Sequence, residues 1–139
     1  MQRIHLERDL ALPVARAHAH LAEHENLGPL FGARVTRVRD GDTERNGVGS
    51  VRALRVGPLP AFDETVTAFV PGELIEYRIT RGGVLRHHRG RMRFSPTAGG
   101  TRLTYDVEFG AVVPGLDRLV RRRLERSLGR GLDDVARLG

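Results

Sequence analysis

The sequence contains no cysteine and no tryptophan among its 139 residues. Without cysteine, disulfides, thiol nucleophiles and thiolate metal ligands are all excluded. Long apolar runs are also missing, because no uncharged apolar segment approaches the roughly 20 residues that a membrane helix needs. The first residues, MQRIHLERDL, lack the apolar segment of a secretory signal. We therefore expect a cytoplasmic protein with no membrane span.

Lysine is absent as well, so all 23 basic residues are arginine, against 17 acidic residues and a net charge of +6. Nucleic-acid binders normally include lysine among their phosphate contacts and aromatic side chains for stacking. Aromatic residues make up only 5% of this chain, and acidic residues are interspersed among the arginines. The uniform use of arginine is typical of a GC-rich genome, and the composition disfavours nucleic-acid binding.

One long amphipathic helix is predicted at the end of the chain, over residues 114–138. At 100° per residue its apolar side chains fall on one side. This side consists of Leu116, Val120, Leu124, Leu128, Val135 and Leu138, with Ser127 and Gly131 among them. Pro114 suits a helix start, and Asp117 places negative charge in the first turn, where the helix dipole favours it. The apolar side needs a partner, and a sheet is the natural one.

Gly129 and Gly131 are unexpected inside this helix, because an interior glycine costs roughly 1 kcal/mol relative to alanine. Gly131 lies near the centre of the apolar side. Either the helix packs very closely on the sheet there, or it passes over a cavity that a bulky side chain would fill. The sequence leaves both explanations open.

Most of the preceding chain alternates between apolar and polar residues, which is typical of strands with one face in water. Turn residues such as Gly57-Pro58, Pro71-Gly72 and Gly82-Gly83 separate the segments. Strands are expected over residues 3–10, 33–40, 50–56, 61–70, 74–80, 87–95 and 101–109. Residues 14–24 and 25–30 have the pattern of two short helices.

The short connections make neighbouring strands antiparallel. The expected fold class is therefore α+β: a curved seven-stranded antiparallel sheet, two short helices after the first strand, and the long C-terminal helix across the sheet. Hydrophobic residues make up 40% of the chain and charged residues 29%, which is typical of a globular protein. At this length we expect a single domain over residues 1–139.

Several segments, taken in this order, resemble the SRPBCC superfamily, also called the START-like or helix-grip fold. They are residues 46–52 (NGVGSVR), 64–69 (ETVTAF), 75–79 (IEYRI) and 100–105 (GTRLTY), with residues 24–27 (HENL) before Phe31. The resemblance runs nearly end to end and implies polyketide cyclase/dehydrase and lipid-transport relatives with a ligand cavity. Because such relatives include binders, transfer proteins and enzymes, it does not imply one activity. One departure is His18, where relatives often have a large aromatic residue.

Strand parity indicates which side chains face the cavity, because alternate residues lie on the same face of a strand. It places Ala68 and the residues of a candidate site on the inner face. The candidate lining, from strands and helix, is Arg52, Leu54, Glu64, Val66, Tyr77, Ile79, His88, Met92, Tyr105, Leu124, Leu128 and Gly131. An apolar pocket with a few polar groups is typical of a small-molecule site. A lipid, an isoprenoid or an aromatic polyketide would suit it.

Arg52 and Glu64 bring opposite charges to the inner face from two strands that the turn at 57–60 connects. A buried charge must be paired or lose its ionisation. We therefore hypothesise an ion pair, placed diagonally across the two strands and joined by the phenol of Tyr77 or Tyr105. The alternative is that the strands end at the rim and both charges are in water.

Some short segments match metal-binding or nucleotide-binding motifs but have simpler interpretations. Residues 20–24 (HLAEH) match the H-x-x-E-H pattern of inverted zinc metalloproteases. The third ligand and the long helical scaffold are missing, so we interpret His20 and His24 as solvated histidines that share a helix face. Gly47-Val48-Gly49 precedes a strand rather than a helix, unlike a dinucleotide loop, and His87 and His88 would point to opposite faces. We expect no metal and no cofactor.

Two functions follow from these residues. The first, which we predict, is a module that binds or transfers a small hydrophobic molecule and needs only the cavity. The second is a polyketide cyclase or dehydratase, with His88 as base, Tyr77 or Arg52 stabilising an enolate, and Glu64 as a further acid–base candidate. Turnover, the identity of the ligand and the choice between monomer and homodimer are left open by the sequence.

Overall fold

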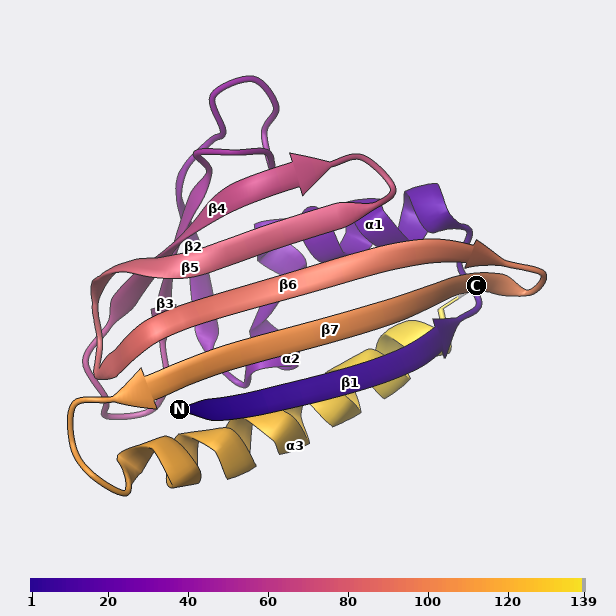
Figure 1. The fold of residues 1–139 in the computed structure, drawn as a ribbon. Coiled ribbons are helices and arrows are strands. Elements are labelled where there is room, and N and C mark those ends of the chain that lie inside the picture. Colours follow the sequence, from indigo (N-terminus) through magenta and orange to yellow (C-terminus); the bar gives the residue numbers. More distant parts are fainter. Residues whose placement is uncertain (139) are drawn as a thin grey trace.

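Seven antiparallel strands form one open sheet in the computed structural model, which describes residues 1–138 (Figure 1). The order across the sheet is β1-β7-β6-β5-β4-β3-β2, and each pair of neighbours is antiparallel. In chain order the elements are β1 (Gln2–Leu10), α1 (Val14–Ala22), the short 3-10 helix η1 (His24–Asn26), α2 (Gly28–Phe31), β2 (Arg34–Arg39), β3 (Val51–Arg55), β4 (Phe62–Val70), β5 (Leu74–Gly82), β6 (Leu85–Thr97), β7 (Gly100–Ala111) and α3 (Leu116–Ala136).

The helices gather on one face of this sheet, and α3 runs along it beside β1 (Figure 1). Side chains that alternate toward the helices form the core, among them Ile75, Met92 and Leu103. The opposite face carries charged side chains such as Arg91 and Glu76. The predicted α+β helix-grip architecture is confirmed, with three short helical pieces after β1 instead of two.

Irregularities in the ladder change which residues face inward. Register shifts occur in β2, in β6 and at two places in the β4–β5 pair, where the extra residue lies first in β5 and then in β4. Such bulges bend a strand and increase its twist. The extra residue in β4, Thr67, brings Phe69 rather than Ala68 to the inner face, where its ring centroid lies 4.9 Å from that of His18. The predicted inward position of Ala68 is therefore wrong. In β6 the shift exposes His87 at φ 52 and leaves His88 buried.

The burial of α3 is uneven along its length. The helix begins at Leu116, two residues after the predicted start, and Gly115 at φ 86 precedes it. All of its buried residues lie in its second half, and they are Ser127, Leu128, Gly131, Leu132 and Val135. Leu132, which the predicted apolar side lacks, is fully buried, whereas Leu138 is 41% exposed. No helix within residues 1–138 is long and apolar enough to cross a membrane.

Gly131 marks a close contact between two helices. A Cβ atom at this position would lie 2.8 Å from the Cα of Leu30 in α2 and 2.9 Å from its Cδ1. Of the two explanations for this glycine, close packing is therefore the right one. The helix packs here on α2, however, and not on the sheet. Among residues 1–138, atoms of Leu30 occupy the space that a larger side chain here would need.

Replacing Gly131 with alanine is expected to lower the free energy of unfolding by up to about 2 kcal/mol. Overpacking against the Leu30 backbone costs about 1–3 kcal/mol, which exceeds the gain of up to about 1 kcal/mol from better helix propensity. Denaturant unfolding would measure the difference. Gly129→Ala is the matched control, because its Cβ would meet only the Arg8 side chain at 3.7 Å, and it should stabilise. Equal stabilisation by both variants would contradict the contact.

Candidate ligand-binding site

A cavity lies at the end of the sheet where the β3–β4 loop, the β5–β6 turn and the first half of α3 meet. The cavity has a volume of about 90 Å³, and the empty space between its walls, counted out into open solvent, is about 760 Å³. The lining is mostly apolar. It consists of Phe31, Leu54, Val56, Leu59, Pro60, Phe62, Glu64, Tyr77, Ile79, Val84, Leu85, His88, Val120, Arg123 and Leu124.

The hypothesised ion pair is present and buried. Arg52 Nε donates a hydrogen bond of 2.8 Å to Glu64 Oε1, and the two side chains are 2% and 5% exposed. The register of β3 and β4 places the two residues directly opposite each other rather than diagonally, which corrects the predicted arrangement. Because both charges are removed from water, each depends on the other for compensation.

The guanidinium of Arg52 lies against two aromatic rings. Its Cζ is 4.7 Å from the ring centroid of Tyr77 and 5.4 Å from that of Phe31, within the range of cation–π attraction. The hydroxyls of Tyr77 and Tyr105 hydrogen-bond to each other, so the predicted phenol bridge to the ion pair is wrong. Within residues 1–138, Nη2 of Arg52 is a buried donor without a hydrogen-bond partner.

His88 lies beside the ion pair. Its Nδ1 accepts a hydrogen bond of 3.1 Å from the backbone N–H of Ile79, so a neutral ring carries its proton on Nε2, 3.6 Å from Glu64 Oε2. Burial lowers the pKa of His88 and outweighs the opposite effect of the nearby Glu64 charge, while the Arg52 charge lowers it further. His88 is therefore neutral at pH 7, and its one ring lone pair is engaged with the main chain.

The two buried tyrosines cannot supply a base. Burial raises the pKa of Tyr77 and that of Tyr105 far above neutrality, so both phenols stay protonated. The Tyr77 ring packs directly on Gly90 of β6, where a Cβ atom would overlap the end of the ring. Gly90 thus makes room for Tyr77 on the cavity floor.

Half of the predicted lining residues are brought together at this cavity. These six are Leu54, Glu64, Tyr77, Ile79, His88 and Leu124. The other six do not line it and lie buried elsewhere in the core: Arg52, Val66, Met92, Tyr105, Leu128 and Gly131. Arg52 touches the site indirectly, through Glu64 and the rings of Phe31 and Tyr77.

The remaining lining residues were not in the predicted set. They are Phe31, Val56, Leu59, Pro60, Phe62, Val84, Leu85, Val120 and Arg123. Strand parity places Val56 and Phe62 on the inner face and helix periodicity places Val120 on the apolar side, but the candidate lining did not include them. Leu59, Pro60 and Val84 lie in connections, where no period applies.

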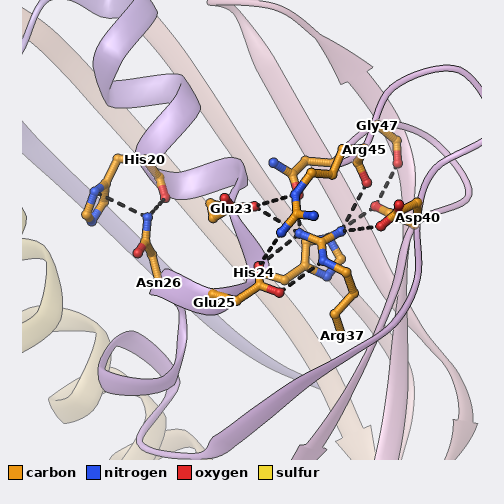
Figure 2. Close-up of polar contacts among 11 residues, drawn as sticks. His20, Glu23, His24, Glu25, Asn26, Arg37, Asp40, Arg45 and Gly47 are labelled. Atoms are coloured by element: carbon orange, nitrogen blue, oxygen red, sulfur yellow. Dashed lines mark hydrogen bonds and ion pairs between the residues drawn. The ribbon is translucent and has the colours of Figure 1, made fainter.

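The two histidines of the H-x-x-E-H segment lie in different elements (Figure 2). α1 ends at Ala22, so His24 belongs to η1 and does not share a helix face with His20. His20 contacts Asn26, whose Nδ2 donates to the His20 carbonyl at 3.0 Å. Within residues 1–138, no three His, Cys, Asp or Glu side chains converge as metal ligands would.

His24 is fully buried, which overturns its interpretation as a solvated histidine. Its Nε2 lies 3.1 Å from Ser50 Oγ, and that hydroxyl donates to the Gly47 carbonyl at 2.7 Å. The Ser50 hydroxyl therefore accepts from His24 Nε2–H. Burial lowers the pKa of His24 to about 3, with a further contribution from the Arg52 charge. His24 is thus a neutral core residue.

Arg37 of β2 ties η1 to the loop after β2 (Figure 2). Its hydrogen bonds of 2.6–3.3 Å go to Glu23, Glu25, Asp40, Asn46 and the carbonyl of Arg45. The hydrogen bond from Arg37 lowers the pKa of Glu25 to about 2. This network holds η1, and with it His24, against the start of β3.

The fold and its cavity define a START-like domain of the kind that binds small molecules. The chain belongs to the polyketide cyclase/dehydrase and lipid-transport family, because the model of the family described as "Polyketide cyclase / dehydrase and lipid transport" matches residues 1–138. No curated protein matches the sequence.

Solved structures share the fold at low sequence identity. A protein from Thermus thermophilus superposes with a TM-score of 0.76 at 18% identity, with 97% of each chain covered. A START superfamily protein from Mycobacterium smegmatis gives 0.75 at 15% identity, with 96% of each chain covered. The Zhui aromatase/cyclase from a Streptomyces species gives 0.69 at 19% identity, covering 96% of this chain and 88% of its own.

Proposed function

We propose that the protein binds a small hydrophobic molecule, such as a lipid, an isoprenoid or an aromatic polyketide, in the cavity beneath the first half of α3. The observation that carries the proposal is an apolar lining that surrounds a small polar floor of Glu64, Tyr77 and His88. This combination is typical of a small-molecule site. The family description and the similarity to an aromatase/cyclase support the same classes of ligand.

The polar floor would orient the ligand through one oxygen atom. Glu64 Oε2 is free of the Arg52 hydrogen bond and could accept from a hydroxyl group, and His88 Nε2–H could donate to a carbonyl. The apolar walls would bury the rest of the molecule, and burial of apolar surface supplies about 25 cal/mol per Å². The ligand is therefore expected to be an apolar body with a hydroxyl or keto group at one end.

The cavity is too small to enclose a ligand of the proposed classes completely. Its volume, about 90 Å³, is smaller than the roughly 150 Å³ that holds benzene in an engineered core cavity. A ligand of lipid or polyketide size must therefore extend through the mouth. Side chains at the mouth, such as Leu59, Val120 and Leu124, would move to admit it.

Leu124→Trp is expected to weaken binding of a naphthalene fluorophore by about tenfold or more. The larger ring would occupy the mouth, and loss of contact over roughly 60 Å² of apolar surface corresponds to that factor. Val70→Trp is the control, because Val70 is 41% exposed and lies at the opposite end of β4 from Phe62. Fluorescence titration measures both, and equal affinities would reject the cavity. Native mass spectrometry of protein from its own host would identify a bound molecule.

A second candidate function is a cyclase or dehydratase that uses Glu64 as its base. The favouring observation is that a carboxylate lines the cavity with one oxygen, Oε2, not bonded to Arg52. His88 is less suited to that role than the sequence suggested, because its Nδ1 lone pair is engaged by Ile79 N–H. Turnover of a poly-β-keto substrate with a rate that depends on Glu64 would establish this function in place of simple binding.

A further inference from the structure

The turn before α3 and the first turn of that helix expose large apolar side chains. Val112, Val113 and Leu119 are 53%, 55% and 63% exposed. Scattered single apolar residues on a surface need no explanation, but a contiguous group often marks an interaction site. We refer to these three residues as the apolar tip.

A stripe of arginines continues from the apolar tip along the outer side of α3. Leu119 and the arginines Arg122, Arg123, Arg126 and Arg130 line one shallow hollow. At 100° per residue, the five side chains fall within about 100° of the helix circumference. We refer to the four arginines as the arginine stripe. All four are exposed, and none lies within 4.0 Å of a carboxylate of residues 1–138, whereas the neighbouring Arg121 pairs with Glu125.

The apolar tip and the arginine stripe border the mouth of the cavity. The backbone N–H of Val112 donates a hydrogen bond of 3.1 Å to the carbonyl of Val84, and Val84 lines the cavity. Arg123 lines both the cavity and the shallow hollow. An object in contact with this surface would therefore face the entrance.

We propose that this surface docks on an anionic phospholipid bilayer, with the apolar tip inserted among the acyl chains and the arginine stripe on the lipid phosphates. Guanidinium groups bind phosphate oxygens in pairs, and basic residues at a membrane surface are attracted to anionic lipids. An acidic protein would also match the arginines, but it would not account for the exposed valines in the turn before α3. Apolar residues next to a basic helix face are typical of interfacial membrane contacts.

This docking goes beyond the proposed function, because it does not require that the cavity be occupied. If both proposals hold, the cavity opens toward the bilayer, so an apolar ligand would pass between lipid and protein without crossing water.

Vesicle flotation with the full chain tests the docking. Vesicles of phosphatidylcholine mixed with phosphatidylserine are expected to carry the protein, whereas vesicles of phosphatidylcholine alone are not. The double variant Arg122→Gln/Arg126→Gln should bind the anionic vesicles more than about tenfold more weakly, as should Val112→Ser/Val113→Ser. Arg55→Gln/Arg93→Gln is the matched control, because it removes two exposed arginines from β3 and β6 and should bind as the wild type does.

The outcomes separate the alternatives. Docking is rejected if anionic vesicles are not bound, or if the control variant loses as much binding as the stripe variant. Docking is also rejected, in favour of an acidic protein partner, by a combination of two results. These are that Val112→Ser/Val113→Ser does not change vesicle binding and that soluble polyglutamate displaces the protein completely from the vesicles. None of the substituted residues lines the cavity. Binding of the naphthalene fluorophore should therefore be unchanged in all variants. A failure of docking would then not contradict the proposed ligand-binding function.

Discussion

Replacing Glu64 with alanine is expected to lower the free energy of unfolding by about 3–5 kcal/mol. The substitution removes the only hydrogen-bond acceptor of Arg52 within residues 1–138, yet the guanidinium stays 2% exposed between aromatic rings. A charge left in the core without a partner keeps its full desolvation cost. Urea unfolding followed by circular dichroism would measure the loss.

Two comparisons show whether burial is the cause. Asp9→Ala removes the carboxylate from an exposed pair with Arg102, whose side chains are 69% and 47% exposed, and should cost less than about 1 kcal/mol. Arg52→Met/Glu64→Leu removes both charges and should be more stable than Glu64→Ala alone. A loss for Glu64→Ala no larger than that for Asp9→Ala would contradict a buried pair.

The stability of the protein is expected to fall as the pH is lowered from 7 to 5, with His24 responsible for about 2 kcal/mol of the loss. In the folded state the pKa of His24 is about 3, below its ordinary value of 6.5. Between these two values the unfolded chain binds a proton that the folded chain does not. Stability therefore rises with pH across this window and is lost as the pH falls, by about 1.4 kcal/mol for each pH unit below 6.5.

His24→Gln isolates this contribution, because glutamine keeps a donor for Ser50 but does not titrate. Its unfolding free energy should depend less on pH between 7 and 5 than that of the wild type. His18 and His88 also have lowered pKa values and remain in both proteins, so their effects cancel in the comparison. Glu25 titrates only below this window. If the unfolding free energies of the two proteins changed with pH in the same way, the pKa of His24 would not be lowered by folding.

The periodic parts of the chain were predictable because burial of one face imposes its own spacing on the sequence. The alternation from Ile75 to Ile79 and from Leu103 to Phe109 located β5 and β7 and their inner faces. The same rule placed Arg52 and Glu64 on the inside, against their individual preference for water. The cost of burying an unpaired charge then favoured an ion pair, with both charges in water at the rim as the alternative, and the structure contains the buried pair.

Other features depend on tertiary contacts that no local pattern records. A single extra residue near Thr67 inverts parity, so Phe69 and not Ala68 meets His18. His24 is buried because the Arg37 network holds η1 against β3, and its spacing from His20 gave no sign of this. The cavity occupies one end of the sheet, with walls from loops, so parity found the inner face but not the limits of the cavity.

The two halves of α3 have different roles, because one half is buried in the core and the other covers the cavity. Its C-terminal half anchors the helix through Leu128, Leu132 and Val135, which are 0%, 0% and 7% exposed. Leu116, Val120 and Leu124 in the N-terminal half are only partly covered. Displacing that half would break less apolar contact than displacing the C-terminal half. We therefore expect entry to the cavity to depend on movement of the N-terminal half of α3, while the C-terminal half stays packed.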